Sequence, residues 1–303
     1  MARADGRPGP LPAYLNRRQR AFRSRRWFTD GPGRLECERA GGRGAAWTEE
    51  RATKERATRE GGASKASGGE RSGLCVAGLQ TCEKAAEAAE VTAFWQELGL
   101  PGLVDVHTHF MPPNVQAKVW AVLEQAWPIA YRQPEVGRVA LLRAFGVCRF
   151  GALAYPHKPG MAAWLNAWQA EFAARTPEAL HSATFFPEAG ADGYVADAIT
   201  AGARLFKAHL QVGGYDPRDE LLGPVWGLLA EARVPVVVHC GSGPTAGAFT
   251  GPGPISEVLA RHPRLITIIA HLGSPEYSEF LELAHLYPGV HLDTTMAFTD
   301  VLE

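Results

Sequence analysis

Two histidines that lie two residues apart, His107 and His109, stand at the end of the apolar run Leu103–Phe110. Because side chains alternate across a β-strand, both imidazoles would emerge on one face of that strand and could bind the same ion. Imidazole nitrogen is a good ligand for Zn²⁺ and its neighbours in the first transition row. The alternative interpretation is a buried strand that contains two polar residues by chance.

Further polar side chains stand at the ends of later apolar runs. His209, His239 and His271 each end such a run, Lys207 lies two residues before His209, and Asp293 lies near the end of the last run. A lone histidine is more often a hydrogen-bonded core residue than a ligand. Several strands that end in this way at one face of a parallel sheet instead favour a shared metal site.

The elements that would position these residues follow from the periodicity. From residue 91 onward the apolar pattern alternates between periods of two and 3.6 residues, which is typical of strands and helices around a parallel sheet. Strands are predicted at 103–110, 147–155, 180–186, 204–211, 235–240, 265–271 and 290–294. Helices are predicted at 113–126, 135–146, 161–175, 193–202, 220–232, 254–262 and 277–287. Trp164 and Trp168, four residues apart in one of these helices, are expected in the core.

Seven strands of this kind predict an α/β fold, a (β/α)₈ TIM barrel of which seven strands are visible. The rival is an open, doubly wound sheet. No glycine-rich phosphate loop follows the first strand, where Phe110-Met-Pro-Pro113 stands instead. A barrel also gathers the ends of several strands around one point. The aromatic residues at strand ends, Phe110, Tyr155, Phe185 and Phe186, could line a pocket there, and a core role for the phenylalanines is an equal alternative.

Four short motifs occur in order at barrel spacing: Asp105-Val-His-Thr-His109, Phe206-Lys-Ala-His209, Val237-Val-His-Cys-Gly241 and Ala270-His-Leu-Gly273. Together they resemble the amidohydrolase superfamily, and within it the branch that includes aminocarboxymuconate-semialdehyde decarboxylase and γ-resorcylate decarboxylase. The resemblance covers about residues 98 to 303. It implies a metal-dependent barrel in which His107, His109 and His239 are the metal ligands and His271 is the catalytic histidine.

The resemblance also implies a divalent ion, Zn²⁺ first and Mn²⁺ as the alternative. Lys207 and His209 match positions that face the substrate, although a structural role for them is open. The implied function is that of a metal-dependent hydrolase acting on a small carboxylated or carbonyl-containing substrate. The alternative is a metal-dependent non-oxidative decarboxylase of the same superfamily, and the motifs do not separate the two.

One feature of the family is missing from this chain. Its members carry an aspartate at the end of strand eight, usually after Gly-Ser, and this sequence ends at Glu303 before such a residue. Asp293, in Leu292-Asp-Thr-Thr295, matches the motif of strand seven instead. The barrel domain, residues 91–303, is therefore expected to be truncated at its C-terminus. An inactive fragment, or a non-catalytic interaction protein, is a further interpretation.

Residues 1–90 differ from the rest of the chain in composition. They hold 18 of the 31 Lys and Arg residues but 12 of the 32 Asp and Glu residues, and all ten histidines follow them. Few aliphatic residues occur there in a periodic pattern, so a disordered, low-complexity leader is expected. Its arginine cluster could be a nucleic-acid arm or a transit segment, and the leader could also be non-native, with translation starting at Val91.

The sequence contains no apolar run of about 18 or more residues and no apolar segment of a signal peptide at its start. A cytoplasmic enzyme with a small-molecule substrate and no membrane partner is therefore expected. A nucleic-acid partner is not favoured for the acidic body of the chain, and association into a homo-oligomer is left open.

Overall fold

The computed structural model describes residues 86–125, 129 and 132–297, so the leader lies outside the described residues except for 86–90. Residues 86–97 are helical, and this helix runs across the boundary predicted at residue 90. Its Trp95 indole Nε1 donates a hydrogen bond to the carbonyl of Phe145 at 3.1 Å. That bond ties the helix to the turn that leads into the second strand.

Parallel strands form two sheets, with the orders β1-β2-β3 and β4-β5-β6-β7-β8. Their bounds are β1 Leu103–His109, β2 Val147–Leu153, β3 Ala179–Leu180, β4 Ser182–Thr184, β5 Leu205–His209, β6 Val236–His239, β7 Thr267–Ile269 and β8 Val290–Leu292. Only His181 separates β3 from β4, and both lie around the single strand predicted at 180–186. The seven predicted strands are therefore present, one of them divided between the sheets.

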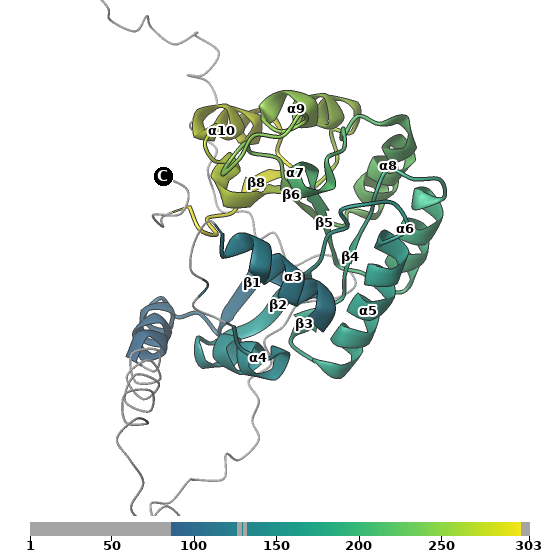
Figure 1. Cartoon of the computed structure of the whole chain (residues 1–303). Coiled ribbons are helices and arrows are strands. Elements are labelled where there is room, and N and C mark those ends of the chain that lie inside the picture. The colour runs from purple at the N-terminus through teal and green to yellow at the C-terminus, as the bar shows by residue number, and fades with distance from the viewer. Residues whose placement is uncertain (1–85, 126–128, 130–131, 298–303) are drawn as a thin grey trace, which may run out of the picture. The chain divides into compact units, whose positions relative to one another are not determined.

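Helices and short helical turns connect the strands (Figure 1). Their bounds are α3 Pro113–Leu123, α4 Glu135–Ala144, α5 Ala162–Arg175, α6 Ala191–Thr200, α7 Leu210–Gly213, η2 Glu220–Leu222, α8 Gly223–Ala232, α9 Pro252–Arg261, η3 Ala270–Gly273 and α10 Tyr277–Leu286. The predicted helices are confirmed to within a few residues, whereas the one-turn helix α7 was not predicted. None of the helices in the described part of the chain is both long and apolar enough to span a membrane.

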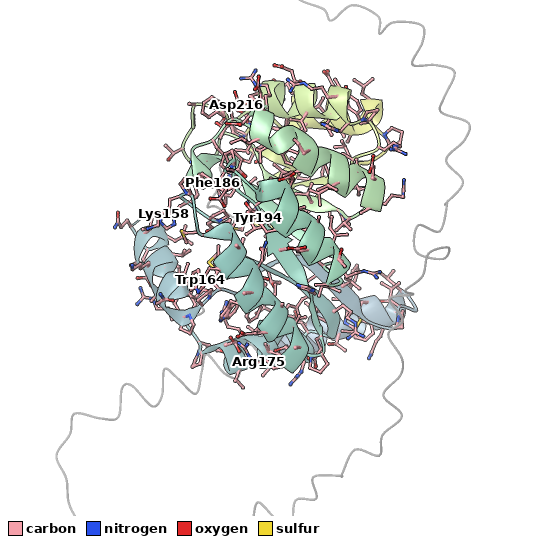
Figure 2. All side chains as sticks on the ribbon, turned by 90° about the vertical axis from the view of Figure 1, so that its right-hand side faces the viewer. Lys158, Trp164, Arg175, Phe186, Tyr194 and Asp216 are labelled. Carbon is pink, nitrogen blue, oxygen red and sulfur yellow. The ribbon has the colours of Figure 1, made fainter. Side chains whose placement is uncertain are left out.

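The expectation that Trp164 belongs to the core was wrong. Its side chain is 46% exposed on the outer surface of α5, where Figure 2 labels it. The buried face of α5 instead follows Leu165, Gln169 and Phe172, which recur at the four- and three-residue spacing of one helix face. Trp168 lies at the edge of that face and stacks on Phe172 with a ring separation of 5.3 Å.

On one side, the two sheets are joined by apolar packing. Leu153 from β2 packs in a buried cluster with Leu205 from β5, Val237 from β6 and Ala270. Gly151 allows this close approach, because a Cβ there would lie 2.6 Å from Leu205 Cδ2. We call this the apolar junction.

On the other side, polar side chains join the two sheets. Within the described residues, β1 pairs only with β2 and β8 only with β7, so the strands do not close into a continuous barrel. His107 of β1 bridges the gap through a 2.8 Å hydrogen bond between its Nδ1 and Oδ2 of Asp293, which directly follows β8. We call this the polar junction.

Candidate active site

Six side chains that carry rings, five histidines and Tyr155, lie in a closed circle at the ends of five strands, and we call this circle the ring of histidines. Successive ring centroids are separated by 5.1 Å for His107–His109, 5.4 Å for His109–Tyr155, 4.7 Å for Tyr155–His209, 4.1 Å for His209–His239, 5.0 Å for His239–His271 and 5.0 Å for His271–His107. The first three rings come from the sheet of β1, and the last three follow β5, β6 and β7. The fold thus brings all five predicted histidines together.

The β1 pair is held in place by backbone hydrogen bonds. The Asp105 carboxylate accepts the backbone N–H of His107 at 2.9 Å, and His109 Nδ1 donates to the carbonyl of Leu153 in β2 at 3.2 Å. Arg138 of α4 adds support that the sequence did not indicate. Its guanidinium donates to the His109 carbonyl at 2.7 Å and lies 4.3 Å from the centroid of the Phe110 ring.

Phe110 itself belongs to the core rather than to a pocket, as do Phe185 and Phe186. Among the aromatic residues at strand ends, Tyr155 contacts the histidines directly. Burial raises the pKa of Tyr155 to about 12, so its phenol is protonated at neutral pH. Its position after the second apolar run was the only signal for it in the sequence.

Lys207 lies fully buried in β5, with its Nζ 3.2 Å from His107 Nε2. Burial lowers the pKa of Lys207 to about 7, against the opposing effect of the Asp293 charge. Its amine therefore titrates near neutral pH inside the site. Thr184 in the neighbouring strand donates its hydroxyl to the Lys207 carbonyl at 2.7 Å and holds this part of β5 in place.

The strand predicted at 204–211 ends at His209, because the chain turns there into α7. His209 is the N-cap of that turn, and its Nδ1 accepts the backbone N–H of Val212 at 3.3 Å. Gly214 then ends α7 in the left-handed conformation, with φ of 62°. This local turn aims the His209 ring at His239, on which it stacks with an interplanar angle of 11°.

His271 lies outside the strand predicted at 265–271, because β7 ends at Ile269 and a tight turn follows. Its φ is 56°, in the left-handed region that non-glycine residues rarely occupy. Asp293 stabilises this conformation, since its Oδ1 accepts the His271 backbone N–H at 2.9 Å and its carbonyl accepts that of Leu272 at 2.8 Å. A strained backbone held by its surroundings is common at functional sites.

The hydrogen-bond partners assign a tautomer to each imidazole, since carbonyl and carboxylate oxygens can only accept. His109 Nδ1 and His271 Nδ1 donate to the carbonyls of Leu153 and Thr295, and His239 Nε2 donates to that of Gly243 at 3.1 Å. Each therefore keeps a lone pair on its other nitrogen. His209 differs, because its Nδ1 lone pair already accepts from the backbone.

The site is electrostatically arranged to keep these imidazoles neutral. Burial, followed by the nearby Lys207 charge, lowers the pKa of His107 to about 4 and that of His239 to about 3. Burial also lowers the pKa values of His109, His209 and His271. Burial is the largest single effect and acts against ionisation of Asp293, but the hydrogen bonds and charges of His107 and His271 together outweigh it and lower the Asp293 pKa to about 2.

Two sets of residues could hold a divalent ion. His107, His109 and His239 are the ligands that the sequence predicts, and each has a nitrogen lone pair that no backbone group uses. A second group, His107, His271 and Asp293, has ligand atoms that all lie within 4.8 Å of one another. Both sets contain His107. In the second set His271 and Asp293 are ligands, whereas in the first set they are not.

Comparison with known proteins decides the family. The amidohydrolase family model matches residues 104–302, about two thirds of the chain. The chain belongs to the amidohydrolase family. This amidohydrolase has no match among curated protein sequences.

Solved structures show the fold of this amidohydrolase at low sequence identity. The uncharacterised TIM-barrel protein Bb4693 from Bordetella bronchiseptica is 18% identical with a TM-score of 0.51, and the match covers 65% of this chain and 77% of that protein. The 5-carboxyvanillate decarboxylase LigW from Sphingomonas paucimobilis is 16% identical with a TM-score of 0.43, covering 65% and 78% respectively. The first of these supports an α/β fold of the TIM-barrel type.

Proposed function

We propose that this amidohydrolase is a metal-dependent hydrolase acting on a small substrate with a carbonyl or carboxylate group. The observation that carries the proposal is the set of four neutral imidazoles, His107, His109, His239 and His271, each with a lone pair that no backbone group uses. Nitrogen donors of this kind suit Zn²⁺ and, less strongly, Mn²⁺. The donor set therefore fits the divalent ion that the family implies.

In this proposal His107, His109 and His239 hold the ion, and His271 contacts the substrate. A bound divalent cation acts as a Lewis acid on a carbonyl or carboxylate oxygen. Because burial keeps the imidazoles neutral, their lone pairs remain available at neutral pH. His107 Nε2 lies 3.2 Å from Lys207 Nζ, so use of this nitrogen as a ligand requires the lysine amine to move aside.

Lys207 and His209 would then bind the substrate. The Lys207 ammonium would attract a substrate carboxylate, since its amine lies inside the ring of histidines and titrates near neutral pH. The proton of His209 is on Nε2, because its Nδ1 accepts from Val212, so this residue can donate a hydrogen bond to a substrate oxygen. Both roles favour an anionic substrate.

The second candidate is a non-oxidative decarboxylase, and the buried Lys207 favours it. A substrate carboxylate held by this amine would leave as CO₂, and the carbon to which it was bonded would keep the electron pair of the broken bond and take a proton from a neighbouring donor. A hydrolase and a decarboxylase would need the same ion and differ in the product.

The test is a turnover assay on the full chain loaded with Zn²⁺ or Mn²⁺. Substrates would be a panel of amides and lactones and a panel of aromatic carboxylates, with CO₂ release measured for the second. We expect turnover that needs the ion and is lost in His271→Asn. The exposed His285 of α10 provides a matched control, since His285→Ala should retain full activity.

Two results would overturn the proposal. Turnover that survives complete metal chelation would exclude an ion-dependent mechanism. No turnover of either panel by metal-loaded, folded protein would favour the interpretation of this chain as an inactive fragment or an interaction protein.

A further inference from the structure

The carboxylate of Asp293 makes three hydrogen bonds, and its two oxygens are used differently. Oδ1 accepts two backbone N–H groups, that of His271 at 2.9 Å and that of Thr295 at 3.1 Å. Oδ2 lies 2.8 Å from His107 Nδ1. The carboxylate is 9% exposed, so water contributes little to its hydrogen bonding.

We infer that Asp293 is a positioning residue, which holds His107 in the tautomer with its proton on Nδ1 and so leaves Nε2 as the ligand atom. An ionised carboxylate can only accept, so its partner Nδ1 must carry the proton. Lys207 Nζ, a donor, faces the opposite nitrogen at 3.2 Å. In its ammonium form Lys207 can only donate, so it favours the same His107 tautomer that Asp293 imposes. The identity of the ligand rests on the proposed function, whereas the tautomer does not.

The two backbone donors make this arrangement sensitive to one atom. In Asp293→Asn the amide oxygen must stay at the Oδ1 position, because backbone N–H groups cannot accept. The NH₂ group would then face His107 Nδ1, where it can donate but not accept. Unlike a loss of packing, this nearly isosteric change sets a donor against a donor. It should shift the His107 proton to Nε2, which then has no lone pair for an ion.

This role differs from direct ligation by Asp293. In the group formed by His107, His271 and Asp293, the carboxylate itself would bind the ion. Here its oxygens instead serve His107, His271 and Thr295. Carboxylates that accept the second N–H of a ligating histidine fix its orientation, and their loss typically weakens metal binding by about 10–100-fold.

The experiment uses the full chain labelled with nitrogen-15 histidine, in buffer with a chelator. Long-range proton–nitrogen spectra at neutral pH distinguish Nδ1–H from Nε2–H imidazoles, and His107→Gln identifies the His107 signals by their loss. Zn²⁺ affinity is measured separately by competition titration. Asp219→Asn is the matched control, since its carboxylate also accepts a backbone N–H group, that of Leu221 at 2.9 Å, in a turn that carries none of the histidines.

We expect the wild-type protein to show His107 with its proton on Nδ1 only. Asp293→Asn should abolish this exclusive tautomer and weaken Zn²⁺ binding at least about tenfold, while Asp219→Asn should leave the tautomer as it is and change the affinity by no more than about twofold. An Nε2–H tautomer in the wild-type protein would overturn the inference even if the variant did not fold.

The remaining outcomes test either the inference about Asp293 or the proposed function. An unchanged tautomer in Asp293→Asn together with lost Zn²⁺ binding would assign Asp293 as a ligand and overturn the inference. An altered tautomer with unchanged affinity would overturn the role of His107 Nε2. If the tautomer changes as expected but wild-type protein binds no Zn²⁺, Asp293 still positions His107 and it is the proposed function that fails.

Discussion

The two sheets meet at two junctions built from opposite chemistry. At the apolar junction, Leu153, Leu205 and Val237 are fully or almost fully buried among aliphatic side chains. At the polar junction, His107 and Asp293 form a buried hydrogen bond beside Lys207. Both adjoin the ring of histidines, since the Leu153 carbonyl accepts a hydrogen bond from His109 and His107 is itself a member of the ring.

The two junctions differ in what they contribute, one to stability and the other to the chemistry of the site. Apolar burial is non-directional and independent of pH, so it can hold two sheets together without specifying any protonation state. A buried hydrogen bond between a carboxylate and an imidazole is directional and fixes the tautomer, at the cost of burying polar groups. We therefore expect the apolar junction to supply stability and the polar junction to orient the site.

The largest effect on stability should come from Leu153→Ala. Removing a fully buried leucine side chain leaves a cavity and should lower the free energy of unfolding by about 2–5 kcal/mol. Urea unfolding would measure this, with Leu153→Met, which nearly conserves volume, expected to cost less than about 1.5 kcal/mol. Equal losses in the two variants would show that the apolar junction does not depend on packing.

The next largest effect should be a dependence of the free energy of unfolding on pH, which arises at the polar junction. Because the His107 pKa is lowered to about 4, the unfolded chain binds more protons than the folded protein below about pH 6.5. The His107 contribution to stability is therefore fully present above that pH and falls as the pH drops toward 4. Between pH 6.5 and 5, His107 alone should cost about 2 kcal/mol, at about 1.4 kcal/mol per pH unit.

Urea unfolding at the two pH values, with metal chelated, should show a loss of at least this size, because burial also lowers the pKa values of His109, His209, His239 and His271. Lys207 does not produce it, since its lowered pKa of about 7 makes stability vary above that pH rather than below it. The cost of Leu153→Ala should be the same at both pH values. A cost that changes with pH would contradict the separation of the two junctions.

A smaller effect should follow from Arg138→Met. This arginine contacts the His109 carbonyl and the Phe110 ring within the first sheet and its helices, so it crosses neither junction. Loss of its hydrogen bond should lower the free energy of unfolding by about 1–2 kcal/mol. The slope of stability between pH 6.5 and 5 should stay that of the wild type, and a flatter slope would assign Arg138 to the polar junction.

The smallest effect should come from Tyr155→Phe, which keeps the ring contacts with His109 and His209 but removes the hydroxyl. The free energy of unfolding should change by no more than about 0.5 kcal/mol. The number of ions bound per chain should not change. A loss of bound metal in this variant would show that the phenol, and not only the imidazoles, takes part in binding the ion.

The sequence predicted most of the fold because strands buried on both faces and amphipathic helices each leave a clear periodicity. It also located His107, His109, His209, His239 and His271 at strand ends. It did not predict the turn that places His271 at positive φ, since that depends on Asp293 from a distant segment. Arg138 carried no signal either, because its role arises only when α4 packs beside β1.

The role of Asp293 was likewise not predictable from the sequence. The motif placed it at the end of the last visible strand, but its hydrogen bond to His107 joins residues 186 positions apart in the sequence. Which oxygen accepts from which group depends on the geometry of two turns. Sequence patterns report which residues share a face, whereas tautomers and hydrogen-bond partners require the assembled site.

The most direct measurement is the metal content of the purified full chain, determined by elemental analysis after loading with Zn²⁺ and gel filtration. Wild-type protein and His285→Ala should retain about one ion per chain, and the double variant His109→Ala/His239→Ala should retain none. Undiminished zinc in the double variant would contradict ligation by His107, His109 and His239, and would point instead to the second set, His107, His271 and Asp293. Folded wild-type protein without zinc would contradict the proposed metal site altogether.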